Sequence, residues 1–380
     1  MKIGFDISQT GQHKAGCGFL AYSLIRALAE VDHKNEYIQY PTFGDFYFDP
    51  EWKKSVKFVQ QRNFQIGLGH EKFEQAKAFW ASPTADFETQ LGSPDIIQSN
   101  NFFCPVGFKK TKLVYFLHDL IFLQEPDLTT EVNRIGCFQG VFRANLFADF
   151  VIANSNYSRE KFLEYFPHYP EEKVEVVHLA SRFSGQSDTP STKPKRFSTL
   201  KEDSFWLNVG TLEPRKNQIG ILKAYAKLKA ELGPTYPLVF AGGRGWQMEH
   251  FNDVISDLGL DQDVIHLDYV SDQELLWLLQ NCFAFVFPSF LEGFGLPVLE
   301  AMSQGAAVIT SSTTSLPEII GDCGLLIDPK NENELYKAMA KLQVNPTERE
   351  KFKHMALERS KLFSWGISAR KILEIYNHIV

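Results

Sequence analysis

The chain has 380 residues, of which 44% are hydrophobic and 22% are charged, and 39 Lys and Arg against 46 Asp and Glu give a net charge of −7. This length predicts two domains with cores of normal size, and the composition excludes a disordered chain or a fibre. The mild acidity argues against a protein that binds duplex DNA, which needs a concentrated basic surface.

Cysteine usage and hydropathy favour a cytoplasmic protein. The five cysteines are odd in number and include no C-x-x-C pair, so neither a disulfide framework nor a structural zinc is expected. The start MKIGFDIS leads directly into a strand-like run and not into an apolar signal segment. The sequence has no stretch of about 18 apolar residues, which predicts that the chain does not cross a membrane.

The first half alternates apolar β-rich runs with stretches of helical periodicity, a pattern typical of a parallel sheet covered on both faces. The clearest helix is expected at Phe19–Glu30. Strands are expected at Lys2–Ile7, Lys112–Leu117, Phe150–Ala153 and Val174–His178.

The stretch from Ser181 to Asp203 is rich in Ser, Thr, Pro and Lys, which predicts a linker. The alternation then restarts. Strands are expected at Phe205–Val209, Leu238–Ala241, Val264–Leu267, Phe283–Pro288 and Ala307–Thr310. Helices are expected at Gln218–Leu232, Trp246–Leu258, Asp272–Leu279, and from Pro297 and Pro317. We therefore predict an α/β protein of two doubly wound, Rossmann-like domains, with the ligand in the cleft between them.

Aromatic residues are unusually dense from Phe43 to Phe87, in a chain with 33 Phe. We favour a core with an irregular subdomain. The alternative is an apolar, lysine-dotted surface that rests on lipid headgroups or on a lipid-linked acceptor.

The segment VFPSFLEGFGLPVLEAM is the most informative part of the sequence. A strand ends at its Pro288, and Pro297 stands where a helix should begin. Between them, glycines allow a tight loop whose amides point beyond the helix N-terminus, a ready site for an anion. The expected loop residues are Gly293, Phe294, Gly295 and Leu296.

Two carboxylates belong to the same segment. Glu292 lies in the loop, and Glu300 follows one turn into the helix. A carboxylate only accepts hydrogen bonds, and its two oxygens match two adjacent hydroxyls of a ribose or hexose. The alternative is an ordinary strand–loop–helix crossover with Glu300 as a solvated helix residue.

A second loop, GTLEPRKN, runs from Gly210 to Asn217 between a strand and a helix that Asn217 could cap. Arg215 and Lys216 stand at a helix N-terminus, where the dipole disfavours cations, so the loop favours phosphate binding over a plain basic loop. In AGGRGW, Arg244 follows the next strand and suits a phosphate or sugar edge.

In the first half, His118 ends an apolar strand at the edge where a doubly wound site opens. It is either a core histidine or a hydrogen-bond partner of substrate. Gly16 and Gly18 precede the first long helix and could bring amides near a phosphate. Asn154 and Ser155 end another strand and are equally consistent with a helix N-cap.

No motif indicates a metal site, a hydrolase or a P-loop. Asp261-Gln262-Asp263 matches the acidic pair of metal-dependent sugar-nucleotide enzymes, but it falls in an expected surface turn, so we predict no metal. The sequence contains neither G-x-S-x-G nor G-x-x-x-x-G-K-[ST].

Together these stretches resemble the family 4 retaining glycosyltransferases of the GT-B fold, over almost the whole chain. GTLEPRKN, AGGRGW, DYVSDQEL and FVFPSFLEGFGLPVLEAM occur in the family's order, and Glu292 and Glu300 reproduce its E-x7-E pattern. The resemblance implies an acceptor-side domain at residues 1–180 and a nucleotide-sugar domain at 204–363. A C-terminal helix at 364–380 would pack back onto the first domain.

The resemblance also implies roles for these residues. Arg215 and Lys216 would bind the donor diphosphate, Glu300 the ribose hydroxyls, and Glu292 with the loop amides the transferred sugar and its phosphate. His118 would contact the donor sugar. The reaction would need no metal or other cofactor and would retain the anomeric configuration. The usual pair of flanking carboxylates of glycoside hydrolysis is not evident in the sequence, so hydrolysis is not the favoured reaction.

Similarity to mannosyltransferases of cell-surface polysaccharide assembly implies GDP-mannose as donor and a glycan or lipid-linked acceptor. The alternative interpretation of the aromatic stretch adds peripheral contact with the inner membrane face. A UDP-sugar donor, a GT-B sugar-nucleotide epimerase and a non-catalytic binding protein remain alternatives. Two departures from the family are Phe19 and Thr211, which stand where many members carry Arg.

Overall fold

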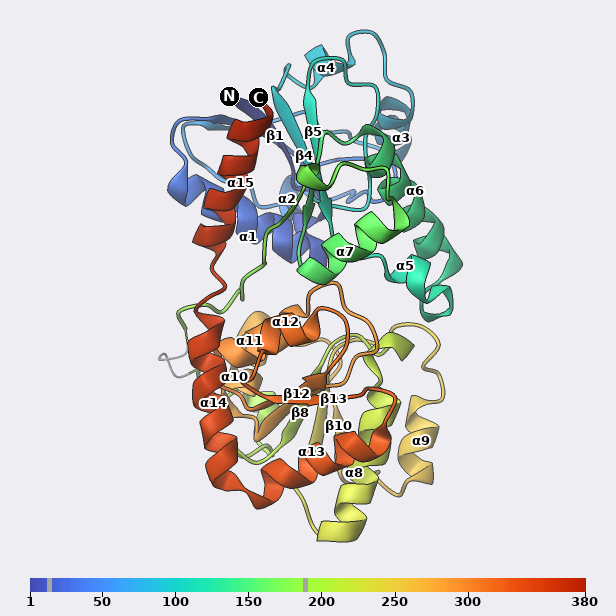
Figure 1. Ribbon diagram of the computed structural model, residues 1–380, viewed down its shortest axis with the longest axis vertical. Helices are drawn as coiled ribbons and strands as arrows, with labels where there is room; N and C mark the ends of the chain where they lie inside the picture. Colours follow the sequence, from blue (N-terminus) through green and yellow to red (C-terminus); the bar gives the residue numbers. More distant parts are fainter. Residues whose placement is uncertain (12–15, 187–190) are drawn as a thin grey trace. The chain divides into compact units, whose positions relative to one another are not determined.

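The computed structural model describes residues 1–11, 16–186 and 191–380 (Figure 1). The chain forms two compact units. The first comprises Met1–Leu179 and Ser364–Val380, and the second comprises Ala180–Phe363. The described part of the expected linker, from Ser181 to Asp203, therefore belongs to the second unit.

The first unit is built on a seven-stranded sheet in the order β3-β2-β1-β4-β5-β6-β7. Its strands are β1 (Lys2–Asp6), β2 (Glu36–Tyr40), β3 (Phe64–Ile66), β4 (Ile96–Ser99), β5 (Lys112–Leu117), β6 (Phe150–Ala153) and β7 (Val174–Val176). Its helices are α1 (Gly16–Val31), α2 (Trp52–Ser55), α3 (Phe73–Ala81), α4 (Phe87–Gln90), α5 (Ile121–Gln124), α6 (Glu131–Phe147), α7 (Asn156–Tyr165) and α15 (Trp365–Ile379). Helix α15, the last of the chain, packs against α1 (Figure 1).

The second unit is built on a six-stranded sheet in the order β10-β9-β8-β11-β12-β13. Its strands are β8 (Trp206–Val209), β9 (Leu238–Ala241), β10 (Val264–His266), β11 (Ala284–Phe287), β12 (Val308–Ser311) and β13 (Leu325–Ile327). Its helices are α8 (Gln218–Leu232), α9 (Phe251–Asp257), α10 (Asp272–Asn281), α11 (Leu296–Ser303), α12 (Leu316–Ile320), α13 (Glu332–Val344) and α14 (Pro346–Ser360).

Each sheet reverses its strand order once, which fixes where a ligand site can form. Every strand pair of the described chain is parallel. The reversal lies between β1 and β4 in the first unit and between β8 and β11 in the second. Ligands of doubly wound sheets bind beyond the carboxyl ends of the strands at this point. A ligand site of the second unit is therefore expected at the loops after β8 and β11.

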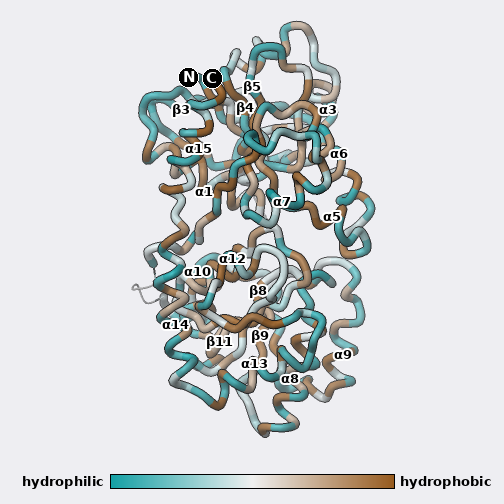
Figure 2. Tube along the Cα trace, viewed as in Figure 1, coloured by the Kyte–Doolittle hydropathy of each residue, from teal (hydrophilic) through white to brown (hydrophobic). Residues whose placement is uncertain are grey.

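Buried apolar strands form the core of each unit, and β9 and β11 stand out as hydrophobic in Figure 2. The aromatic stretch from Phe43 to Phe87 is mostly core, as the favoured interpretation predicts. Phe43, Trp80 and Phe87 are at most 2% exposed, and their rings pack at centroid distances of 4.5 to 5.7 Å.

Helix α9 is shorter than predicted, because it begins at Phe251 and not at Trp246. Gln247 has φ of +57°, in the left-handed region, which a right-handed helix cannot include. The predicted helix therefore has a turn in its first part.

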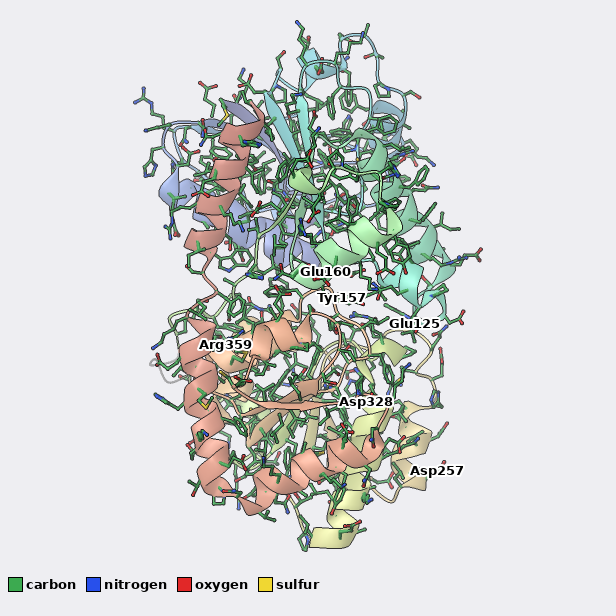
Figure 3. All side chains as sticks on the ribbon, viewed as in Figure 1. Glu125, Tyr157, Glu160, Asp257, Asp328 and Arg359 are labelled. Atoms are coloured by element: carbon green, nitrogen blue, oxygen red, sulfur yellow. The ribbon has the colours of Figure 1, made fainter. Side chains whose placement is uncertain are left out.

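Arg359, near the end of α14, fixes the end of α12 (Figure 3). Its Nε donates to the carbonyl of Ile319 at 2.7 Å and its Nη2 to that of Glu318 at 2.8 Å. The guanidinium thus satisfies carbonyls that a helix end leaves without partners. Among the helices that the structure describes, no helix is long and apolar enough to cross a membrane.

Candidate functional site

The loop after β8 places Arg215 and Lys216 in a short 3₁₀ turn, Pro214–Lys216, ahead of α8. Asn217 follows in the left-handed region with φ of +56°. The prediction that its side chain caps α8 is wrong, because the structure shows no capping bond there. Its Nδ2 donates instead to the carbonyls of Pro288, at 3.2 Å, and Pro329, at 2.8 Å. The amide thereby ties the loop after β8 to the loops after β11 and β13.

Both cations of this loop converge on Glu292, in the loop after β11. Lys216 Nζ lies 2.6 Å from Glu292 Oε1, and Arg215 Nη1 lies 2.9 Å from Glu292 Oε2. Ser289 Oγ donates to Glu292 Oε1 at 2.7 Å, and Glu213 Oε1 accepts from Arg215 Nη2 at 2.5 Å. The adjacent strands β8 and β11 thus present two cations and two carboxylates at one sheet edge.

Burial and charge act against each other in this cluster. Burial alone would raise the pKa of Glu292, but the charges of Arg215 and Lys216, with hydrogen bonds from Lys216 and Ser289, hold that pKa below its ordinary value. Burial, together with the Arg215 charge, lowers the pKa of Lys216 against the pull of Glu292. A multiply charged anion would compensate the two cations further.

Helix α11 begins beside this cluster, as the GFGLP sequence predicts. Gly295 is its N-cap, with φ of +104°, and makes no side-chain capping bond. A Cβ there would lie 2.6 Å from Leu316 Cδ2 and would be strained at this φ, so the position favours glycine. The Ser315 hydroxyl donates to the carbonyls of Glu292 and Phe294, both at 2.9 Å, which fixes the loop. The helix dipole therefore adds positive potential next to Arg215 and Lys216.

Glu300 lies inside α11, 4% exposed, and binds an arginine that the sequence did not single out. Arg182 Nε donates to Glu300 Oε1 at 2.7 Å and Arg182 Nη2 to Oε2 at 3.3 Å. Burial raises the pKa of Glu300, and Arg182 opposes that rise. The third nitrogen of Arg182, Nη1, lies 2.9 Å from Asp272 Oδ1.

The loops after β8 and β9 lie side by side. Gly242 has φ of +154°, and a Cβ on it would lie 2.1 Å from the carbonyl oxygen of Gly210. Leu212 and Arg244 form an isolated parallel bridge, and the Arg244 side chain is exposed. The structure thus brings the predicted residues Gly210 and Arg244 to the sheet edge that carries Arg215 and Lys216.

The first unit holds His118 in a buried polar network at the carboxyl end of β5. His118 Nε2 lies 2.8 Å from the carbonyl oxygen of Asn100, and Asn154 Nδ2 donates to the carbonyl of His118 at 2.6 Å. Burial lowers the pKa of His118 to about 4. A carbonyl only accepts, so the neutral ring carries its proton on Nε2 and leaves Nδ1 as an acceptor.

Asp6, at the end of β1, extends this network. It accepts from Ser8 and from the backbone amide of Asn100, and burial raises its pKa to about 6. Gly16 and Gly18 stand in the first turn of α1. The loop that connects β1 to them includes 12–15, which lie outside the described residues.

Two further residues of the cluster lie in the motifs named above. Glu213 belongs to GTLEPRKN, and Ser289 belongs to VFPSFLEGFGLPVLEAM, so the sequence contains a signal for both. Arg182 gave no local signal, because its partner Glu300 is 118 residues away. Its other partner, Asp272, lies within DYVSDQEL. Asn154 bonds to His118, while Ser155 caps α7 by accepting from Ser158.

The acidic pair at Asp261 and Asp263 binds side chains of its own unit. Asp261 accepts from Ser256 at 2.7 Å, and Asp263 pairs with Lys229 at 2.5 Å. Within the described ranges, no three His, Cys, Asp or Glu side chains gather into a set that could hold a metal ion.

Known proteins resemble this chain along most of its length. The "Glycosyltransferase Family 4" description matches residues 15–180, and the "Glycosyl transferases group 1" description matches residues 191–359. The chain is 31% identical over 284 residues to O-antigen chain mannosyltransferase B of Escherichia coli, which covers 74% of each protein. It is 29% identical to the serotype-specific mannosyltransferase WbdA of Escherichia coli, over 76% of this chain and 37% of WbdA.

Solved structures show the fold. The crystal structure of Anabaena HepE in complex with UDP and glucose aligns over 100% of both chains, with a TM-score of 0.71 at 19% identity. The two doubly wound units are therefore a GT-B fold, as predicted. From the fold and the relatives together, we conclude that the chain belongs to the family 4 glycosyltransferases and is a hexosyltransferase.

Proposed function

We propose that this enzyme is a retaining, metal-independent transferase that moves mannose from GDP-mannose to a glycan or lipid-linked acceptor in cell-surface polysaccharide assembly. The observation that carries the proposal is the convergence of Arg215 and Lys216 on Glu292 at the carboxyl ends of β8 and β11. Two cations beside the start of α11 form a site for the diphosphate of a nucleotide sugar.

The same cluster suits the chemistry of transfer. As the bond between the sugar's anomeric carbon and the phosphate oxygen breaks, negative charge grows on the departing diphosphate. Arg215, Lys216 and the α11 dipole stabilise that charge most in the transition state. The acceptor hydroxyl attacks on the face that the phosphate leaves, its oxygen bonds to the anomeric carbon, and its proton passes to a phosphate oxygen. Configuration is then retained.

Glu292 and Glu300 have separate roles in this proposal. Glu292 lies with the cations and would hold the transferred sugar, together with the amides of the Gly293–Leu296 loop. Glu300, on the buried face of α11, would accept hydrogen bonds from the ribose hydroxyls. His118, with Nδ1 as an acceptor, would accept a hydrogen bond from a hydroxyl of the donor sugar.

The names of the relatives support mannose and O-antigen assembly, since both O-antigen chain mannosyltransferase B and WbdA are mannosyltransferases. A UDP-sugar is the second candidate donor, because HepE was solved with UDP. The experiment offers GDP-mannose and UDP-glucose, each with an acceptor glycan in excess EDTA, and follows transfer and anomeric configuration by NMR.

We expect α-linked mannose from GDP-mannose in EDTA. Transfer from UDP-glucose but not from GDP-mannose would show that the donor is a UDP-sugar. A product of inverted anomeric configuration would contradict the retaining mechanism. Loss of activity in EDTA would contradict metal independence. Epimerisation without acceptor would identify an epimerase. Arg215→Ala at wild-type turnover would refute the site itself.

We also propose that the enzyme touches an anionic lipid surface through α6. Six apolar side chains of α6 are 42 to 75% exposed, although α6 is a helix of a folded unit. They are Val132, Ile135, Phe138, Phe142, Leu146 and Phe147. The Phe138 and Phe142 rings stack at 5.6 Å. Phe147 lines a surface pocket with Lys109, Lys110 and Lys112. Lys112 pairs with Asp149 of the same pocket at 3.0 Å, so Lys109 and Lys110 are the cations offered to lipid phosphates next to the apolar face.

Vesicle sedimentation tests this contact. We expect binding to phosphatidylglycerol vesicles, weaker binding to phosphatidylcholine vesicles, and loss of most binding in Phe138→Ser/Phe142→Ser. Phe73→Ser is the control, because Phe73 is exposed but lies on α3. Equal binding of both lipids, or an unchanged double variant, would overturn the contact; concentration-dependent dimers that the double variant abolishes would assign the face to a second copy.

A further inference from the structure

Arg182 binds both carboxylate oxygens of Glu300, the residue that we propose binds the ribose hydroxyls of the donor. Its Nε and Nη2 bind Glu300 Oε1 and Oε2 at 2.7 and 3.3 Å. This parallel fork fixes the plane of the Glu300 carboxylate, which a single hydrogen bond would leave free to rotate.

The backbone around Arg182 is itself anchored to α11. Ser303 Oγ donates to Ser181 Oγ at 2.8 Å, and Gln304 Nε2 donates to the carbonyl of Phe183 at 3.0 Å. Both partners flank Arg182, so the residue is held on each side by the end of the helix that carries Glu300. The guanidinium is also held by Asp272, at 2.9 Å, and lies 5.2 Å from the Phe183 ring.

The fork leaves acceptor capacity on Glu300. Each carboxylate oxygen has two lone pairs, and Arg182 uses one on each. Glu300 can therefore accept two more hydrogen bonds, one per oxygen, while Arg182 stays in place. An adjacent pair of ribose hydroxyls supplies two donors.

From this geometry we infer that Arg182 is the positioning residue of the donor site: it orients the Glu300 carboxylate toward the two ribose hydroxyls of the nucleotide. The inference rests on the proposed function. Burial raises the pKa of Glu300, and the charge and hydrogen bonds of Arg182 oppose that rise, so loss of Arg182 should raise this pKa further.

The test measures binding of GDP and of 2′,3′-dideoxy-GDP to the wild-type chain and to variants by calorimetry. The dideoxy nucleotide lacks both ribose hydroxyls, so its affinity measures the binding that does not depend on Glu300. We expect Arg182→Ala to weaken GDP about tenfold and to leave dideoxy-GDP within about twofold. Arg182→Lys should recover part of the loss, because it restores the charge but not the fork.

A pH series separates orientation from a structural role. In Arg182→Gln, the ratio of GDP affinity to dideoxy-GDP affinity should increase as pH rises, because burial raises the pKa of Glu300 and Arg182 no longer opposes that rise. Titration of the phosphates changes both affinities alike and cancels in the ratio. Arg196→Ala is the matched control. Arg196 comes from the same segment and pairs with Glu274 of α10, and its removal should leave both affinities unchanged.

Three other outcomes would contradict the role of Arg182, the role of Glu300 or the proposed function. If Arg182→Ala and Arg182→Lys weaken both nucleotides equally, Arg182 is a structural residue and the donor site stands. If the wild-type chain binds both nucleotides equally, Glu300 does not read the ribose and the inference is lost. If it binds neither, and neither UDP nor dideoxy-UDP, the proposed function is lost as well.

Discussion

Lys216 Nζ lies 2.6 Å from Glu292 Oε1 and 4.6 Å from the centre of the Phe287 ring. Both charged side chains are 9% exposed. Glu292 thus holds the Lys216 ammonium group against the Phe287 ring at the end of β11. Such preorganisation is what stabilises charge that develops only in the transition state.

Lys216→Ala should reduce turnover by about 10²- to 10³-fold, because it removes a preorganised cation from the site that we propose for the leaving diphosphate. The chain should still fold, since Glu292 keeps its ion pair with Arg215. Steady-state transfer assays and far-UV circular dichroism check both statements. The matched control is Lys229→Ala, which breaks an ion pair with Asp263 away from the site and should retain full activity; equal activities of the two variants would contradict the role of Lys216.

Gly295→Ala should destabilise the chain more than another glycine substitution at a positive φ. Gly295 combines φ of +104° with a Cβ position 2.6 Å from Leu316 Cδ2, whereas Gly305 has φ of +72° and open space around it. We expect Gly305→Ala to lower the free energy of unfolding by about 1 kcal/mol, and Gly295→Ala to lower it by a further 1 to 3 kcal/mol or so. Urea unfolding measures both, and equal losses would show that the contact with Leu316 carries no cost.

Asn217 offers a test of how the loops are tied together. Asn217→Ala removes the bonds to Pro288 and Pro329 and leaves a Cβ at φ of +56°, whereas Asn217→Gly removes the bonds but relieves the backbone. Both variants should lose stability, about 1 to 3 kcal/mol for the two buried carbonyls, and Ala should lose about 1 kcal/mol more than Gly. Calorimetric melting of both variants decides this; a stable Asn217→Ala would mean that the loops do not depend on the amide.

The sequence predicts the elements whose signals are local. Strands β5, β6 and β9 and helix α8 have their predicted bounds, because each combines a clear period with turn residues at its ends. Strand β4 gave no such signal, because its Gln98 and Ser99 are buried polar residues. Their partners are Tyr376, 278 residues away, and the carbonyl of Phe103.

The residues of the site also divide into those with a local sequence signal and those without one. Arg215, Lys216, Glu292 and Gly295 stand in two motifs, and parallel strands bring the ends of those motifs to one edge. The Arg182–Glu300 fork could not be predicted, since Arg182 lies in a stretch whose composition indicates a linker and its contact depends on how that stretch folds onto α11. Composition identifies polar segments but not the helix against which they pack.

The buried pair of Asp6 and His118 predicts opposing pH effects on stability. Burial raises the pKa of Asp6 from 3.8 to about 6, so its contribution is lost as pH rises through 6. Burial lowers the pKa of His118 from 6.5 to about 4, so its contribution is present above 6.5 and is lost as pH falls through 4. Each shift corresponds to about 3 kcal/mol, and the two nearly cancel between pH 4.5 and 6.5.

Asp6→Asn removes one side of this balance. Its free energy of unfolding should gain about 2 kcal/mol more than that of the wild-type chain when pH rises from 4.5 to 6.5, because only the His118 effect remains. His118→Gln should show the reverse difference of similar size. Urea unfolding at the two pH values gives each quantity, and comparison with the wild-type chain removes the contribution of all other carboxylates. Parallel pH dependence in the three proteins would show that neither group has a shifted pKa in the folded state.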